Sequence, residues 1–401
     1  MLFRSPRTAI DRFILDQLQD LELTPLPEAD RTTLIRRIYF DVTGLPPTTD
    51  QVATFVADPA PDAYERLVDR VLGSHHYGER WAQHWLDLAR FAETDGFEHD
   101  KTRSQAWRYR DWVIDAFNED MPYDTFVHWQ LAGDEIAPNT PAASTATTFC
   151  VAGPDMPDIN SQDERRHHLL NEITSTVGAA LMGLQIGCAQ CHDHKYDPVS
   201  QADFYRLRAV FEPAVILKKN RSVNVLQPAK RTAPSHLMIR GDWQRPGPEI
   251  DAGVPRIANP AGAVEPLANT AQPRSALARW LTQPDHPLTS RVIANRIWQH
   301  HFGNGLARST SDFGLVGEEP SHPELLDWLA TELMQHDWRL KHLHRLILTS
   351  ATYRQIGSAF QLGPPDGPTS PPTSVNASPS AAFTITGRSH SARPACATCS
   401  T

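Results

Sequence analysis

The segment Cys188-Ala189-Gln190-Cys191-His192 carries the most specific chemistry in this chain of 401 residues. A C-x-x-C-H pattern is typical of covalent c-type haem attachment. Two thiols at this spacing can add to the two vinyl groups of a haem, and the histidine that follows can bind the iron as an axial ligand. The pattern therefore predicts that Cys188 and Cys191 anchor a haem c and that His192 ligates its iron.

Two other interpretations of the motif remain open. The cysteines could hold zinc together with His192 and His194, or they could form a redox or structural disulfide. A four-ligand zinc site usually has a second Cys/His pair at short spacing, and the sequence contains none in register. The zinc alternative describes a metal-dependent hydrolase or a polysaccharide-processing factor, whereas a bare thiol pair describes a non-catalytic scaffold.

Other histidines and methionines are weaker candidates for metal binding. The sequence does not select a sixth iron ligand among the four candidates upstream of the motif, which are Met156, His167, His168 and Met182. In the second half of the chain His300, His301 and His322 could ligate a metal, although isolated histidines near helix ends are usually packing or capping residues.

A second polar stretch, residues 93–100, concentrates carboxylates around a glycine, as loops that bind hard cations do. Its spacing does not match an EF-hand. With the preceding helix it forms a candidate polar cleft, suited to acid/base chemistry or to substrate binding, whose residues are His84, Asp87, Arg90, Asp95, Glu98 and Asp100. The alternative is an ion-pair network, because arginines at 103, 108 and 110 follow and can lock the loop between two helices.

The composition excludes several classes of protein. The net charge is −9 and no basic stripe is present, so we expect no nucleic-acid partner. No apolar run is long enough to span a bilayer, and five cysteines are too few for a disulfide scaffold of this size. Residues 1–7 lack the features of an export signal. Covalent haem attachment takes place outside the cytoplasmic membrane, so the haem interpretation requires an export signal upstream of this chain.

Apolar periodicity predicts a mainly α fold with two helical domains. The first domain covers residues 8–215 and ends in the C-x-x-C-H motif, to which a continuous helix over 164–184 leads directly. Residues 216–272 form a linker with a short β-hairpin, built from 222–226 and 236–239. A smaller helical domain follows at 273–355, and 356–401 is a disordered tail rich in Pro, Ser and Thr. Four S/T/D-x-x-E/Q/D pairs indicate helix starts, at Thr48/Gln51, Asp62/Glu65, Ser200/Asp203 and Ser321/Glu324.

Longer segments carry a resemblance to a known family. In the first domain these are DVTGLPP at 41–47, YGERW at 77–81, HWLDLAR at 84–90, WRYRDWVI at 107–114, QLAGD at 130–134 and CAQCHDHKYDP at 188–198. In the second domain they are NRIWQHHFG at 295–303, SDFG at 311–314, HPELLDWL at 322–329 and LILTSATYRQ at 346–355. Together they resemble the planctomycete cytochrome-C-associated two-domain family of unknown function.

The resemblance implies an exported, haem-associated protein, located in the periplasm or another extracytoplasmic compartment. Family members usually carry an export signal, and their second domain continues in helical sequence beyond the point where this chain becomes rich in Pro and Ser. We therefore expect the second domain to be incomplete here. The resemblance supplies no reaction. The prediction is an exported c-type haem protein that either exchanges electrons with a partner protein or serves as a redox subunit of a larger assembly.

Overall fold

The structure is a computed structural model that describes residues 6–97, 100–227, 233–259, 267 and 270–357. This part of the chain is mainly helical and contains one small sheet, as the sequence predicted. None of the helices in these residues combines the length and the apolar composition that are needed to span a bilayer. Almost all of the predicted disordered tail lies outside the described residues.

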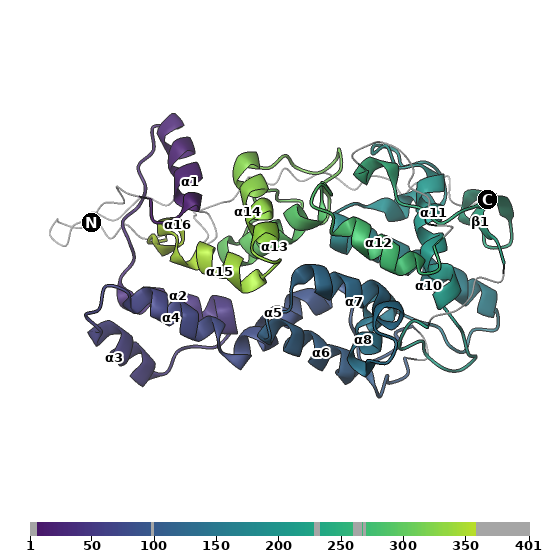
Figure 1. The fold of residues 1–401 in the computed structure, drawn as a ribbon, viewed down its shortest axis with the longest axis horizontal. Coiled ribbons are helices and arrows are strands. Elements are labelled where there is room, and N and C mark those ends of the chain that lie inside the picture. Colours follow the sequence, from purple (N-terminus) through teal and green to yellow (C-terminus); the bar gives the residue numbers. More distant parts are fainter. Residues whose placement is uncertain (1–5, 98–99, 228–232, 260–266, 268–269, 358–401) are drawn as a thin grey trace, which may run out of the picture.

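The first ten helices follow one another from residue 9 to residue 177 (Figure 1). Their bounds are α1 Ala9–Asp20, α2 Arg31–Thr43, α3 Thr49–Ala57, α4 Ala63–Leu72, α5 His75–Leu88, α6 Ala106–Asn118, α7 Tyr123–Ile136, α8 Pro141–Ala146, α9 Thr148–Val151 and α10 Gln162–Val177. The predicted capping box at the start of α3 is confirmed, because the Gln51 amide donates to Thr48 Oγ1 and the Thr48 amide donates to Gln51 Oε1. Asp62 makes no such bond at the start of α4.

The helix that leads to the motif is shorter than predicted. α10 ends at Val177, and a π-helical turn, η1 (Gly178–Met182), follows. Gly183 then has a φ of +60°, a left-handed conformation that glycine adopts without strain, and a Cβ there would lie 2.8 Å from the Phe313 ring. The apolar periodicity continues through this break, so the sequence pattern alone merged two elements into one.

After the break the chain forms a 3-10 turn, η2 (Ile186–Gln190), and then α11 (Gln201–Phe211). The capping box predicted for α11 is confirmed by Ser200 and Asp203, whose side chains each accept from the other's amide. The turn η3 (Glu212–Ala214) ends this part of the chain.

The linker contains a two-stranded antiparallel sheet, β1 (Ser235–Met238) and β2 (Pro246–Ile250), with a turn between them, η4 (Ile239–Gly241). The prediction of β structure at 236–239 is largely confirmed, whereas the prediction at 222–226 is wrong. Residues 222–226 form no strand and instead contact the first domain, for example through the hydrogen bond that Ser222 Oγ donates to Asp95. β2 escaped prediction because its sequence, PGPEI, has little strand propensity.

The remaining helices return along the first domain (Figure 1). The short turn η5 (Arg256–Ala258) precedes α12 Pro273–Leu281, α13 Thr289–Phe302, α14 Pro323–Gln335, α15 Leu340–Thr349 and α16 Ala351–Arg354. α12 packs on α7, α13 on η1, and α15 on α4, so one continuous apolar core runs through both parts. The capping box predicted at Ser321/Glu324 is absent, since α14 begins after His322 without a side-chain cap.

A buried ion pair fastens α12 to α7. Arg274 Nη1 lies 2.6 Å from Asp134 Oδ1, and the two side chains are 1% and 5% exposed. Arg274 Nε also lies 3.1 Å from Glu135. Two buried charges are tolerated at this depth only because each is paired, so the pairing fixes how the second helical part sits on the first.

Candidate functional site

The C-x-x-C-H motif lies on the short turn η2 and the residue that follows it. Ile186 and Ala189 anchor the turn in the core, 1% and 0% exposed. Cys188 and Cys191 face outward, and neither is in a disulfide. The turn packs against α10 and α11. The two cysteines are therefore accessible thiols on a rigid support, which is what covalent attachment to a large ligand requires.

His192 is exposed, and its hydrogen bond fixes its tautomer. Its Nδ1 lies 2.7 Å from the carbonyl oxygen of Asp193, which can only accept, so Nδ1 carries the proton. The lone pair then resides on Nε2. Histidines that ligate metals usually have this arrangement, in which one ring nitrogen donates to a carbonyl or carboxylate and the other is available to the metal.

The second helical part holds the motif segment from both sides. Before the motif, the Phe313 amide donates to the Gly183 carbonyl over 2.6 Å and Gln185 Nε2 donates to the Ser311 carbonyl over 2.9 Å. After the motif, the Leu315 amide donates to Asp197 Oδ1 over 2.6 Å. The loop 311–315 therefore contacts the chain both before and after the motif.

Arg296 of α13 adds a further contact to the segment before the motif. Its guanidinium donates to the carbonyls of Ala179 and Ala180 in η1. Burial lowers the pKa of Arg296 to about 10. These carbonyls belong to the π-helical turn, where the regular helical bonding pattern is altered. The second part of the chain thus satisfies the backbone exposed by the helix break.

Cys191 lies against the turn of the linker hairpin. A Cβ added to Gly241, whose φ is +74°, would lie 2.7 Å from Cys191 Sγ, so only glycine fits this position without a shift. Tyr205 of α11 donates its hydroxyl to the Gln190 carbonyl over 3.0 Å. Burial raises the pKa of Tyr205 to about 12, so the hydroxyl remains a donor over the ordinary pH range.

His194 organises the loop after the motif. Its Nδ1 accepts from the amide of Asp197 over 2.9 Å, so the proton of the neutral ring lies on Nε2. Neither nitrogen of His194 then presents a lone pair to a metal. Two groups of three metal-type side chains converge within 4.8 Å in the described chain, and neither includes Cys188, Cys191, His192 or His194.

The residues present fit a haem better than a zinc ion. Haem attachment needs two accessible thiols and one imidazole with a free Nε2, whereas zinc needs four donors around one point. Several large apolar side chains are also exposed on the loops that adjoin the motif. These are Tyr196, Ile239, Leu315 and Val316, which are 54%, 40%, 76% and 55% exposed.

The candidate sixth ligands lie in different environments. Met182 is fully buried in the core and His168 is exposed. His167 is 5% exposed and lies 2.9 Å from Asn171 and 3.4 Å from Arg208. Burial, helped by the charge of Arg208, lowers the pKa of His167 to about 4. His167 also interacts with Gly241, whose Cα lies close to Cys191 Sγ, so it is linked to the motif through the linker hairpin.

The residues predicted to form one polar cleft lie in different surroundings in the structure. His84 stacks on His300 of α13, with ring centroids 3.6 Å apart, and Asp87 also acts on His300. Arg90 is largely buried and pairs with Glu172 of α10. Glu98 lies outside the described residues.

Asp95 and Asp100 of the candidate cleft share a hollow of about 310 Å³ with Asp155. Asp95 is buried and lies 2.7 Å from Arg103 Nε, and it also accepts from Ser222. Hydrogen bonds from Thr94 and Gly96 lower the pKa of Asp100. These contacts fasten the loop and match the ion-pair interpretation of this stretch.

Histidines from three helices form a cluster that sequence reasoning treated as separate residues, in which His301 and His344 are buried, His84 is half-buried and His300 is exposed. His301 Nε2 lies 2.8 Å from His344 Nδ1, and the Trp81 ring packs against both. Burial lowers the pKa of His301 to about 3 and lowers that of His344 well below its usual value. Burial also lowers the pKa of His84 to about 3 and that of His300 to about 4. The cluster is therefore neutral and joins α5 to α13 and α15.

Comparison with known families shows where the chain belongs. Residues 9–215, more than half of the chain, match PSCyt2, described as a protein of unknown function (DUF1549), and the chain belongs to that family. Residues 273–361 match PSD1, also described as a protein of unknown function (DUF1553). The two matches agree with the predicted two-domain family, whereas its planctomycete origin stays a prediction. Neither a curated protein nor a solved structure matches the chain.

Proposed function

We propose that this protein is an exported c-type haem protein that exchanges electrons with a partner. Cys188 and Cys191 hold the haem through thioether bonds, and His192 ligates the iron through Nε2. The observation that carries the proposal is the motif turn, on which both thiols are exposed and the hydrogen bond to Asp193 leaves Nε2 available. The haem supplies one-electron chemistry when it is bound.

The surroundings of the motif support a redox partner. Exposed apolar side chains on adjoining loops are typical of surfaces that bind a large apolar ligand or another protein. Tyr196 and Leu315 provide such side chains, and their loops are joined by the hydrogen bond from the Leu315 amide to Asp197. Because covalent haem attachment takes place outside the cytoplasmic membrane, the proposal also places the protein in the periplasm or another extracytoplasmic compartment.

The test is expression with an export signal in a host that matures c-type cytochromes. The proposal predicts a reduced α-band in the absorption spectrum and haem that stays with the chain on a denaturing gel. Replacement of both cysteines, Cys188→Ala and Cys191→Ala, removes the gel signal, whereas replacement of the buried Cys150 by Ala leaves it. A colourless protein from a host that matures a control cytochrome overturns the proposal. Metal analysis of that same sample then decides between the zinc alternative and a bare thiol pair.

A further inference from the structure

Three metal-type side chains converge where α14 ends and α15 begins. Glu332 Oε1 lies 3.2 Å from His336 Nδ1 and 2.9 Å from His342 Nε2. The two imidazole rings lie side by side, with centroids 3.8 Å apart and planes 12° apart. Glu332 and His336 belong to the last turn of α14 and its cap, and His342 lies in the first turn of α15. Two imidazoles therefore share one carboxylate oxygen, although they are six residues apart.

The turn between the two helices holds this arrangement in place. Asp337 and Trp338 both have left-handed backbone conformations, with φ values of 54° and 55°. Trp338 is 8% exposed, its ring stacks on Tyr123, and its carbonyl accepts from the Tyr123 amide over 2.9 Å. Two consecutive non-glycine residues at positive φ are energetically costly, and the anchored Trp338 ring maintains them. The donors are thus brought together by a fixed turn.

The charge around the three residues favours a cation. Glu332 and His336 lie at the C-terminal end of α14, where the helix dipole attracts positive charge, whereas His342 lies in the first turn of α15, where the dipole opposes it. The Glu332 side chain is 16% exposed, so its carboxylate is partly shielded from water. The neighbouring cations are directed elsewhere, because Arg339 donates to the Asp120 carbonyl and Lys341 donates to the Asn118 carbonyl over 2.8 Å.

The distances match a small tetrahedral site. Zinc binds histidine nitrogen at about 2.0–2.1 Å and carboxylate oxygen at about 2.0–2.2 Å, which sets neighbouring ligand atoms about 3.3 Å apart. The oxygen-to-nitrogen distances of 2.9 and 3.2 Å are close to this separation. The near-parallel rings must turn so that their lone pairs converge. In this structure His336 Nδ1 lies 3.0 Å from the Glu332 carbonyl, which can only accept, so Nδ1 carries the proton. Metal binding requires that proton to leave or the ring to turn and present Nε2, and the 47% exposed side chain permits either.

We propose that Glu332, His336 and His342 bind one divalent first-row transition ion, of which Zn²⁺ is the reference case. Two neutral imidazoles and one carboxylate are a common protein ligand set for such ions, and they leave the remaining positions to water. The ion fastens the end of α14 to the start of α15. This site is separate from the haem motif and does not depend on the proposed redox function.

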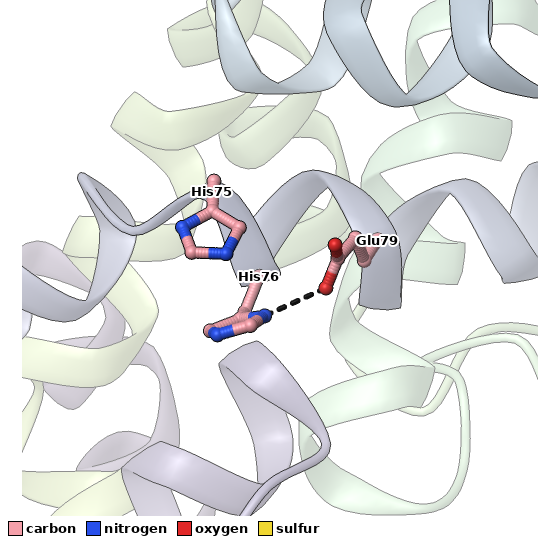
Figure 2. Close-up of side chains that lie close together, drawn as sticks. All are labelled: His75, His76 and Glu79. Atoms are coloured by element: carbon pink, nitrogen blue, oxygen red, sulfur yellow. Dashed lines mark hydrogen bonds and ion pairs between the residues drawn. The ribbon is translucent and has the colours of Figure 1, made fainter.

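A second group of donors provides an internal comparison. His75, His76 and Glu79 lie at the start of α5, where His76 Nδ1 is 2.6 Å from Glu79 Oε2 (Figure 2). This group is more open, since the His76 and Glu79 side chains are 37% and 52% exposed. All three of its donors lie at the N-terminal end of a helix, where the dipole opposes a cation, whereas only His342 does so at the other site. The site at Glu332 is therefore expected to bind the ion more tightly.

The test is calorimetric titration of Zn²⁺ into the full chain in which Cys188, Cys191, Cys396 and Cys399 are all replaced by Ser, so that neither C-x-x-C pair competes for the ion. We expect one tight site per chain. Loss of a supporting partner alone usually lowers metal affinity by about 10–100-fold, so His336→Gln, which removes a ligand, should weaken binding by at least about tenfold. The matched change His76→Gln at the comparison group should leave the tight site unchanged.

Two further measurements separate loss of metal binding from loss of folding. His336 is exposed, so its variant should retain the wild-type far-ultraviolet circular dichroism, and Zn²⁺ should raise the unfolding temperature of the parent chain but not that of His336→Gln. The proposal is overturned if no Zn²⁺ binds, if His336→Gln binds as tightly as the parent, or if His76→Gln removes the tight site.

Discussion

Replacement of His286 by asparagine should change how the stability of the protein depends on pH. His286 is 3% exposed and its ring packs edge-on against Trp280. Its Nδ1 accepts from the amide of Thr289, the first residue of α13, over 3.2 Å, so the ring acts as a cap for that helix. Its Nε2 is buried without a hydrogen-bond partner in the described structure. A proton on Nδ1 would remove the cap and place a charge in the core.

The magnitude follows from the pKa of His286 in the folded and unfolded states. Burial lowers this pKa from 6.5 to about 4 in the folded protein. Between these values the unfolded state binds one more proton than the folded state, so His286 contributes its full stability above pH 6.5 and loses it as the pH falls. The loss approaches about 1.4 kcal/mol per pH unit between the two pKa values and amounts to about 2 kcal/mol between pH 6.5 and pH 4.5.

The assay is urea unfolding of the wild type and of His286→Asn at several pH values between 7.5 and 4.5. Asparagine caps helices well and does not titrate, so the variant should lose less stability on acidification than the wild type. The difference should approach about 1.4 kcal/mol per pH unit below pH 6. His168→Asn is the matched control, because the His168 side chain is 54% exposed and should leave the slope unchanged. Parallel pH profiles for the wild type and His286→Asn would refute the reasoning.

Two further changes test the buried ion pairs and the contact at the motif. Asp155→Asn leaves Arg165 unpaired at a place where both side chains are 1% exposed, so we expect a loss of about 3–5 kcal/mol in the free energy of unfolding; an unchanged urea midpoint would contradict this. Gly241→Ala places a Cβ 2.7 Å from Cys191 Sγ and should reduce the fraction of chains that carry covalent haem, measured by haem staining per unit protein. Gly303→Ala, also at positive φ but with nothing within 4 Å, should reduce stability by about 1 kcal/mol and leave haem attachment intact; equal effects of the two alanines on haem would refute the contact argument.

Local sequence patterns predicted most helices but not where they are interrupted. Apolar spacing and capping residues place α3 and α11 well, since both signals act within a few residues. The same spacing continues across Val177 and Gly183, so it predicted one helix where the structure has a π-helical turn and a break. What fixes that break is the second part of the chain, through Arg296 and Phe313, more than 100 residues away.

The candidate sites differ in the same way: a contiguous motif is visible in the sequence, whereas a group assembled by the fold is not. Covalent attachment depends on a contiguous pattern, so the motif Cys188–His192 could be singled out from the sequence. The group of Glu332, His336 and His342 could not, because the Glu332–His336 spacing is ordinary for a helix and His342 joins them only through the left-handed turn at Asp337 and Trp338. The sequence feature that could have pointed to this group is the run of closely spaced histidines that follows Glu332.

The most direct test of the haem proposal is mass spectrometry of the protein after export in a host that matures c-type cytochromes. We predict that the intact denatured chain gains the mass of one haem and that the added mass stays, after proteolysis, on the fragment that contains residues 188–192. An unmodified fragment from a host that loads haem onto a control cytochrome would contradict the account.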